Sequence, residues 1–393
     1  MNSRVRVATA LSHREPDRVP YDLGAIGPTG ISIQAFRNLL AFIRWDEKGE
    51  VGDIASQRAN LSEVFLRQFR VDTRSFRVRA QGAWSLKLED GGEYASFTDE
   101  WGIRRKMAKE GGQHFFIFHH PLASVETADL ARFPWPDPLD PKRLPDTDKE
   151  IAGVRDQADP AFVLGTPFSS GLLQFGAQLE GHERFFTDLA LDPFRTEWIL
   201  EKLLELKFAC YRNALDAFGE WIDVVCEMDD FGHQQSLWIS VDSFRKWIKP
   251  RYTRLFSWIK KEYGKKILLH SDGAIYPLIP DIIDMGVDAL NPIQLGAKGM
   301  GDVRKMKKQF GDSLGFWGGG VDIQKTLPFG TPEEVENEVK RNIEILAPGG
   351  GFVFAATQAI QPETPPENIM AMWKALQAYG GCCASAIALD RRL

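Results

Sequence analysis

The residues with the clearest chemical potential lie in segment 265–273, which reads KKILLHSDG. Its apolar run 267–269 predicts a strand that is buried on both faces. Side chains two apart on a strand point the same way, so we expect His270 and Asp272 to face one site just beyond the end of this strand. Gly273 then allows the chain to turn tightly. In parallel α/β folds this end of the sheet binds ligands, so we expect the functional site there.

Acidic residues follow a second apolar run, at 222–228, and they widen the chemistry open to this site. Imidazole nitrogen and carboxylate oxygen are both metal ligands, so His270, Asp272 and Glu227 form one predicted metal site. The same kinds of group can act without a metal in acid–base catalysis, for which His270, Asp229 and Asp230 are the predicted catalytic residues. Alternation along the run puts Glu227 and Asp229 on one face of the strand and Asp230 on the other.

Simpler roles remain open for several of these residues. A carboxylate at the end of a strand often only caps the following helix, and Asp272 could do no more than that. Two adjacent carboxylates, such as Asp229 and Asp230, repel each other unless a positive charge lies nearby. His270 is the stronger candidate, because an imidazole that ends an apolar strand must find a polar partner. The predicted substrate-binding side chains follow the later strands: Asn291, Gln294, Trp317 and Gln358.

The elements that must position these side chains alternate between strand and helix. The pattern predicts eight strands, at 19–23, 73–79, 162–166, 222–228, 267–269, 289–293, 314–318 and 352–356. The predicted helices lie at about 32–44, 57–69, 145–157, 170–219, 241–262, 275–285, 301–310, 331–346 and 365–379. This alternation is typical of an α/β fold of the (β/α)₈ TIM barrel type.

One stretch departs from this rhythm. Residues 80–140 contain short alternating segments separated by glycine pairs, which predict an antiparallel hairpin excursion after the second strand. We therefore expect one barrel domain over residues 1–393, with the excursion at 80–140. An open doubly wound sheet is the alternative, but the chain has no G-x-G-x-x-G after a strand and no G-x-x-x-x-G-K-[ST], so a nucleotide-binding sheet is disfavoured.

The composition limits what the protein can bind. A net charge of −6 gives no electrostatic case for nucleic acid or for an anionic membrane. No apolar run approaches the length of a membrane span and the first residues lack a signal-peptide core, so we expect a cytoplasmic protein. The four cysteines form no C-x-x-C pattern, which argues against a disulfide framework and a Cys₄ zinc site.

A series of motifs in a fixed order now suggests a family. They include HREPDRVPYDLG near the start, TDEWG at 98–102, FPWPDP at 133–138, EMDDFGHQ at 227–234, LLHSDG, GVDALNPIQ, FWGGG and QPETPPENI. The series resembles the uroporphyrinogen decarboxylase superfamily, in particular its corrinoid-dependent methyltransferase-like branch, over nearly the whole chain. The resemblance implies a (β/α)₈ barrel with its pocket at the carboxyl ends of the strands.

The chain departs from true uroporphyrinogen decarboxylases in three loops. Their Arg-rich segment after the first strand reads RVPYDLGAIG here, their Asp after the second strand is absent from SFRVRAQG, and their late His is replaced in TQAIQ. A tetrapyrrole with eight carboxylates needs clustered cations, which these loops do not offer. We therefore argue against decarboxylation of uroporphyrinogen.

The methyltransferase-like branch implies a zinc site and a corrinoid carried by a partner protein. Its zinc motif is His-x-Cys with a later Cys; His270 matches the His, Asp272 replaces the first Cys, and Gln358 lies about where the second would be. An oxygen and nitrogen ligand set makes a harder Lewis acid, suited to withdrawing methyl from an ether or amine, for example a methoxylated aromatic.

Three functions therefore stay open on the sequence. The first is a methyltransferase that moves methyl from a small-molecule substrate to a corrinoid protein. The second is a decarboxylase or lyase acting on another substrate, with Asp229 or Asp230 as acid or base. The third is a non-catalytic ligand-binding barrel. The oligomeric state is also open, with a homodimer as one possibility.

Overall fold

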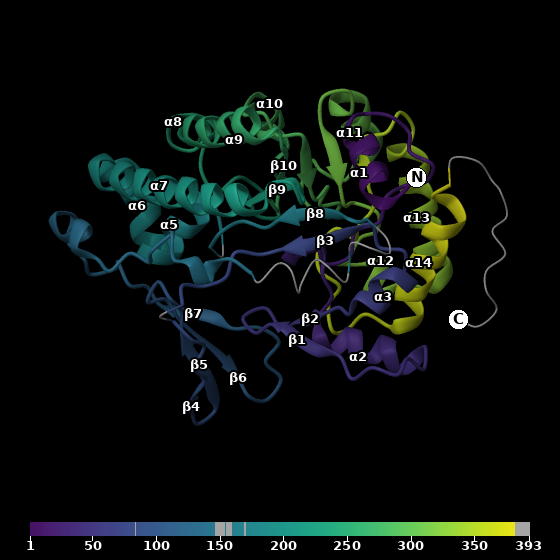
Figure 1. Cartoon of the computed structure of the whole chain (residues 1–393), viewed down its shortest axis with the longest axis horizontal. Coiled ribbons are helices and arrows are strands. Elements are labelled where there is room, and N and C mark those ends of the chain that lie inside the picture. Colours follow the sequence, from purple (N-terminus) through teal and green to yellow (C-terminus); the bar gives the residue numbers. More distant parts are fainter. Residues whose placement is uncertain (83, 146–153, 155–158, 169, 382–393) are drawn as a thin grey trace.

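Short parallel strands form the main sheet, in the order β13-β12-β11-β10-β9-β8-β3 (Figure 1). The computed structural model describes residues 1–82, 84–145, 154, 159–168 and 170–381. The strands are β3 (Thr73–Phe76), β8 (Ala161–Leu164), β9 (Ile222–Met228), β10 (Lys266–His270), β11 (Ala289–Asn291), β12 (Gly315–Trp317) and β13 (Phe352–Val353). Their order follows the order of the chain, as expected when each strand is followed by a crossover on the same side.

The two edges of this sheet are joined by the segment at residues 19–23, which was predicted to be the first strand. Tyr21 forms a parallel bridge with Phe354, next to β13, and the Phe354 amide donates to the Pro20 carbonyl at 2.8 Å. On the other side the Asp72 amide, next to β3, donates to the Tyr21 carbonyl at 2.8 Å. The segment makes too few ladder bonds to count as a regular strand, but it occupies the eighth position. The predicted (β/α)₈ barrel is therefore confirmed.

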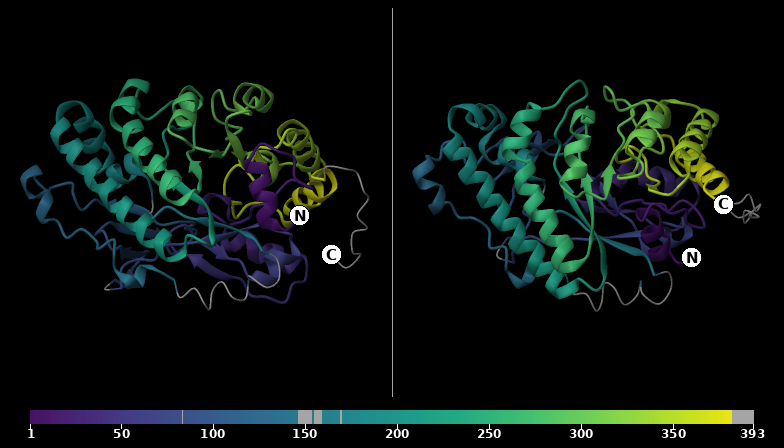
Figure 2. Two further views of the ribbon diagram at one scale, coloured as in Figure 1. Left: turned by 45° about the horizontal axis from the view of Figure 1, so that its top comes forward. Right: turned by 90° about the horizontal axis from the view of Figure 1, so that it is seen from above.

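Helices cover the outer face of the sheet (Figure 2). The α-helices in the described part of the chain are α1 (Ser3–Leu11), α2 (Ile33–Phe42), α3 (Glu63–Gln68), α5 (Leu172–Glu180), α6 (His182–Leu191), α7 (Pro193–Phe218), α8 (Val241–Trp247), α9 (Lys249–Tyr263), α10 (Ile279–Asp284), α11 (Val303–Phe310), α12 (Thr326–Phe329), α13 (Pro332–Leu346) and α14 (Pro366–Tyr379). Within this part of the chain no helix is long and apolar enough to cross a membrane.

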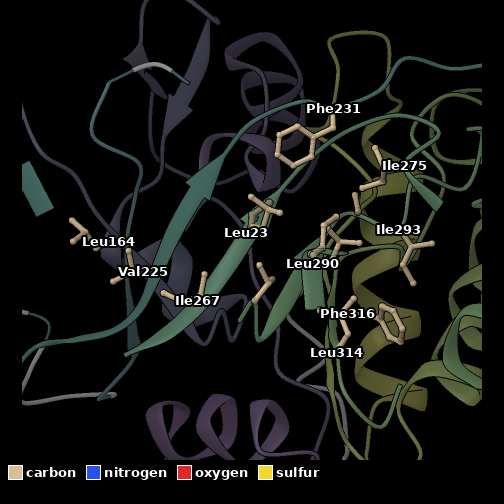
Figure 3. Close-up of a cluster of buried hydrophobic side chains, with 14 of the residues drawn as sticks. Leu23, Leu164, Val225, Phe231, Ile267, Ile275, Leu290, Ile293, Leu314 and Phe316 are labelled. Atoms are coloured by element: carbon tan, nitrogen blue, oxygen red, sulfur yellow. The ribbon is translucent and has the colours of Figure 1, made fainter. Parts of the chain in front are cut away.

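Alternation along the strands creates two separate apolar layers. Val225, Ile267 and Leu290 point outward and pack under the helices (Figure 3). Cys226 and Leu268, one residue further along, point into the barrel. The interior layer consists of Val7, Leu11, Ala25, Ile26, Ala161, Val163, Val224, Cys226, Leu268, Ala289, Trp317 and Val353. A side chain near the end of a strand therefore faces either the helix layer or the barrel mouth, and this choice decides its role.

The predicted excursion is an antiparallel sheet of order β4-β5-β6-β7, built by β4 (Glu89–Gly91), β5 (Tyr94–Thr98), β6 (Arg104–Ala108) and β7 (Phe116–His119). It projects from the barrel in Figure 1. The hairpin prediction for this region is confirmed, because every neighbouring pair of these strands runs antiparallel.

The predicted helix at 57–69 is wrong in its first half. A hairpin of β1 (Glu50–Asp53) and β2 (Arg58–Asn60) precedes α3, which begins only at Glu63. Asp53 closes the hairpin turn by accepting from the Ala55 amide at 2.9 Å, and Ser62 then caps α3. The strand predicted at 73–79 ends at Phe76. The predicted helix at 145–157 lies largely outside the described residues.

Candidate active site at the barrel mouth

Three side chains from two adjacent strands converge at the mouth of the barrel. His270 ends β10, Asp272 follows it by two residues, and Asp230 follows β9. The Nε2 atom of His270 lies 3.6 Å from Asp230 Oδ1 and 3.8 Å from Asp272 Oδ2. One ligand atom from each of the three lies within 4.8 Å of the others. We call His270, Asp272 and Asp230 the mouth triad. The structure thus brings the predicted pair together, along with Asp230, which was predicted as a catalytic residue and not as a metal ligand.

Two hydrogen bonds donated by backbone amides hold the mouth triad in register. The Asp229 amide donates to the His270 carbonyl, and the Asp272 amide donates to Asp230 Oδ1, both at 2.9 Å. Gly273 then turns the chain with φ of +96°. A Cβ atom there would lie 2.3 Å from the Gly232 carbonyl carbon, so only glycine lets the two loops approach this closely. The tight turn predicted at Gly273 is confirmed.

Asn291 fixes the orientation of the His270 ring. Its Nδ2 donates to the Trp317 carbonyl at 2.6 Å, so its Oδ1 faces His270 Nδ1, also at 2.6 Å. The amide oxygen can only accept, and the Nδ1 atom must therefore carry the proton. In the neutral ring the lone pair then lies on Nε2, which points at the two carboxylates. A histidine held in this way is prepared to be a metal ligand or a base.

The fold leaves one of the two carboxylates of the mouth triad partly unsatisfied. Asp230 Oδ2 accepts from Gln174 Nε2 at 2.9 Å, and Asp272 Oδ2 accepts from Gln358 Nε2 at 2.7 Å. Asp272 Oδ1 is buried and has no hydrogen-bond partner among the described residues. Burial raises the pKa of Asp272, although the nearby His270 opposes this shift. An unpaired buried acceptor beside an imidazole lone pair fits a divalent cation, and one nitrogen with two carboxylates is a suitable ligand set.

Glu227, a predicted metal ligand, does not belong to this cluster, and Asp230 lies beside His270 and Asp272 instead. Its Oε1 lies 3.0 Å from Lys207 Nζ, and its Oε2 accepts from Tyr211 at 3.1 Å. Both partners lie on α7, because alternation along β9 turns Glu227 toward the helix layer and turns Met228 toward the barrel interior. The side chain is 1% exposed, so this ion pair is sealed from solvent.

Asp229 faces the same way and caps α5, so the structure does not bring this predicted catalytic residue into the mouth triad. Its carboxylate accepts from the amides of Leu173 and Gln174 and from the Tyr252 hydroxyl, each at 2.8 Å. A Cβ atom on Gly171 would lie 2.3 Å from the Asp229 Cβ, so the helix start needs glycine there. Burial raises the pKa of Asp229 to about 7, against the effect of these hydrogen bonds.

The four predicted substrate-binding residues have internal contacts. Gln358 holds Asp272 and Asn291 holds His270, as described above. Gln294 accepts from the Gly273 amide and braces the turn below the triad. Trp317 is fully buried in the barrel interior, where its indole donates to Asp22 at 2.7 Å. All four residues therefore lie at or beneath the site, and their contact with substrate stays a prediction.

Arg58 is a mouth residue that the sequence analysis missed. It lies on β2, and its charge counteracts the effect of burial on the pKa of Asp272. Residue 58 fell inside a stretch predicted as helix, so nothing in the local pattern pointed to a position at the mouth. Arg58 also lines a cavity of about 350 Å³ together with Ser32, Ser56, Arg105, Phe115 and Gln361.

Comparison with known proteins places the chain in a family. The family model described as "Uroporphyrinogen decarboxylase (URO-D)" matches residues 106–379. The chain belongs to the uroporphyrinogen decarboxylase family. A uroporphyrinogen decarboxylase from Alkalilimnicola ehrlichii is 24% identical over 266 residues, which cover 65% of this chain and 67% of that protein. The structure of a methyltransferase from Methanosarcina mazei matches with a TM-score of 0.61 at 20% identity, covering 96% of this chain and 98% of the other.

These likenesses confirm the superfamily resemblance and the barrel fold. The structure adds one observation about the cations at the mouth of the barrel. The loop after the first strand indeed lacks an arginine cluster, but the mouth does not lack arginine. Arg58 comes from the β1–β2 hairpin, and the Arg77 charge lies near enough to lower the pKa of Arg58, an effect that adds to that of burial.

Proposed function

We propose that this chain is a methyltransferase-type enzyme that takes a methyl group from a small methylated substrate at the barrel mouth and passes it to a corrinoid on a partner protein. The observation that carries the proposal is the mouth triad with its unsatisfied Asp272 Oδ1. A uroporphyrinogen decarboxylase fold that also occurs in a methyltransferase is consistent with this reaction class.

His270, Asp230 and Asp272 are the residues that would hold a divalent metal, with zinc as the proposed ion. When bound there, the metal supplies Lewis acidity that withdraws electrons from the heteroatom carrying the methyl group. Asn291 keeps the proton on His270 Nδ1 and leaves Nε2 available. Gln358 orients Asp272, as Gln174 orients Asp230. Substrates with an ether or amine methyl group, including methoxylated aromatics, suit this oxygen and nitrogen ligand set.

Decarboxylation of a substrate other than uroporphyrinogen is the second candidate, and the environment of Asp272 favours it. Burial raises the pKa of this carboxyl group, so it is better placed than an exposed carboxyl to hold a proton at a reacting carbon. Asp272 replaces Asp229 in this alternative, because Asp229 is occupied in capping α5.

The deciding experiment is metal analysis combined with a methyl-transfer assay. Wild type, His270→Ala and the exposed control His119→Ala are purified without an affinity metal, and metal content is measured by mass spectrometry. We expect near-stoichiometric metal in the wild type and the control and none in His270→Ala, together with loss of methyl transfer from an ether or amine donor to a corrinoid protein.

Four outcomes would count against the proposal. Metal that stays bound in His270→Ala would place the metal site elsewhere. Unchanged methyl transfer in that variant would remove His270 from the reaction. Release of CO₂, with solvent deuterium incorporated at the product carbon, would establish the decarboxylase instead. Tight ligand binding without any turnover would leave a binding protein.

A further inference from the structure

Arg58 is a cation at the mouth with no side-chain partner among the described residues. It is half-buried, and none of the described residues forms a hydrogen bond or a close ion pair with its guanidinium group. Arginine loses hydration when it is buried, and it is normally compensated by an anion. The fold therefore presents a positive group whose partner the described chain does not supply.

The chain makes room for this side chain through glycine. Arg58 is bridged to Ser32, which places it across the mouth loop that contains the 3₁₀ turn Gly27–Thr29. A Cβ atom on Gly27 would lie 2.4 Å from Arg58 Nη1, and one on Gly30 would lie 3.4 Å from Arg58 Cδ. The glycines of the mouth loop thus let the guanidinium group lie against the loop backbone.

The two nearby carboxylates do not form an ion pair with Arg58. Asp53 affects Arg58 electrostatically, but its Oδ1 accepts from the Ala55 amide at 2.9 Å and its Oδ2 accepts from Ser56 Oγ at 2.7 Å. Asp272 also acts on Arg58 through its charge, and its Oδ2 is held by Gln358. Neither carboxylate approaches the guanidinium within ion-pair distance, so the donor groups of Arg58 stay free for a ligand.

The space beside Arg58 has the chemistry of a small anionic ligand site. The cavity of about 350 Å³ has a second arginine in its wall, Arg105, whose Nη2 donates to Gln178 at 3.2 Å and lies 3.5 Å from Asp99. Phe115 provides an apolar surface. The wall residue Ala359 directly follows Gln358, which donates to Asp272. One wall of the cavity therefore adjoins Gln358, the residue that holds Asp272 of the mouth triad.

We propose that this cavity binds the carboxylate of a small aromatic acid, with Arg58 as the residue that pairs with it. A planar guanidinium matches a carboxylate through two parallel hydrogen bonds, and Phe115 offers a face for the aromatic ring. A substrate held in this way would direct its far end toward the mouth triad. The inference rests on the proposed function for the identity of the transferred group, and it narrows the methyl donor to a methoxylated aromatic acid.

Binding of two matched probes tests the inference without any turnover. The affinities of 3-methoxybenzoate and of its neutral isostere 3-methoxybenzamide are measured by calorimetry on the wild type, Arg58→Met, Arg58→Lys and the exposed control Arg104→Met. We expect the wild type and the control to prefer the benzoate by about 10- to 100-fold, as a charge-assisted hydrogen-bonded pair implies. Arg58→Met should lose this preference, while Arg58→Lys should keep part of it.

The arms of the experiment separate the possible failures. Equal affinity for both probes in the wild type, an unchanged preference in Arg58→Met, or no binding of the benzoate would overturn the inference. Inorganic phosphate that competes as strongly as the benzoate would also overturn it, because the site would then be a general anion site. The same titration on His270→Ala distinguishes the two proposals: a preserved preference supports the binding site even where methyl transfer has failed.

Discussion

On the helix side of β9, Asp229 accepts three hydrogen bonds from α5 and Tyr252. On the barrel side the next residue, Asp230, accepts one from Gln174 and one from the Asp272 amide, and it faces His270. Glu227 belongs with Asp229, since Lys207 and Tyr211 satisfy it. The same residue type, in one short segment, therefore serves the fold on one face of the strand and stays available for a ligand on the other.

The difference teaches how to separate structural from functional carboxylates in this barrel. On the helix side of β9, each carboxylate oxygen of Glu227 and Asp229 has a partner within the chain, so these two groups contribute to folding and have little capacity left for a ligand. At the mouth, neither a buried oxygen of Asp272 nor the guanidinium group of Arg58 has a hydrogen-bond partner among the described residues. Unsatisfied polar groups cost stability, and their presence side by side at the end of a barrel is the expected mark of a ligand site.

The strongest test of this contrast is to break the helix-side ion pair. Lys207→Met leaves Glu227 charged and buried without its cation, and we expect the free energy of unfolding to fall by about 3–5 kcal/mol. Urea denaturation measures the change. The matched control is Lys202→Met on the same helix, whose partner Glu205 is exposed and whose loss should cost less than about 1 kcal/mol. The metal content of the folded Lys207→Met protein should equal that of the wild type. A loss of metal would mean that the helix-side ion pair also supports the mouth triad, and the contrast between the two regions would be wrong.

The adjacent carboxylates offer a matched pair of substitutions. Asp229→Asn places an amide opposite two backbone N–H donors, so we expect the free energy of unfolding to fall by about 1–3 kcal/mol with metal affinity unchanged. Asp230→Asn should do the reverse, weakening metal binding by about 10- to 100-fold with a smaller change in stability. Urea denaturation and metal titration are run on both variants. The contrast is contradicted if the two substitutions change the free energy of unfolding and the metal affinity in the same way.

Removal of the group that orients His270 should have a more moderate effect at the mouth. Asn291→Ala frees the imidazole from its Nδ1 partner, and we expect metal affinity to fall by about 10-fold. Competition with a chromophoric chelator measures this affinity. Gln294→Ala, which removes a brace of the neighbouring turn without touching His270, is the control and should change the affinity by less than about threefold. Equal effects of the two would mean that Asn291 acts only through general packing.

The smallest expected effect concerns Asp281, a carboxylate on the outside of the barrel whose partners, like those of Asp229, lie within the chain. Burial acts to raise the pKa of Asp281, but hydrogen bonds from Arg245 and Lys249 outweigh it, so the pKa lies below its ordinary value. A lowered pKa means that this carboxylate stabilises the fold above the ordinary pKa of Asp, near 4, and that the contribution disappears as the pH falls through the lowered value. Asp281→Asn should therefore cost about 1 kcal/mol at pH 7, and less as the pH approaches 3. Urea denaturation across this range checks the trend; a cost that grows toward low pH would contradict it.

Much of the scaffold could be predicted because it depends on local pattern. The strand predicted at 222–228 coincides with β9, and the two-residue period correctly separated Asp230 from Glu227 and Asp229. Period alone does not say which face looks into the barrel. The metal-ligand prediction took Glu227, although Asp230 lies on the face that reaches the mouth.

Arg58 illustrates what local pattern cannot provide. Residues 57–69 have a helical distribution of apolar side chains, but the first part is held as β2 by pairing with β1 and by the bridge from Arg58 to Ser32. These contacts arise between segments that the pattern treats separately. Its position beside Asp272 follows from the barrel, not from its neighbours in the chain.

By itself, the sequence determined the alternation of strands and helices, the tight turn at Gly273 and the pairing of His270 with Asp272, because each depends on residues a few positions apart. Only the tertiary structure decided that Asp230 completes the mouth triad, that Asp229 caps α5, and that Arg58 faces the mouth without a partner in the described part of the chain. The physical reason is that the environment of a charged side chain depends on which distant segments surround it, and closure of the barrel sets those neighbours.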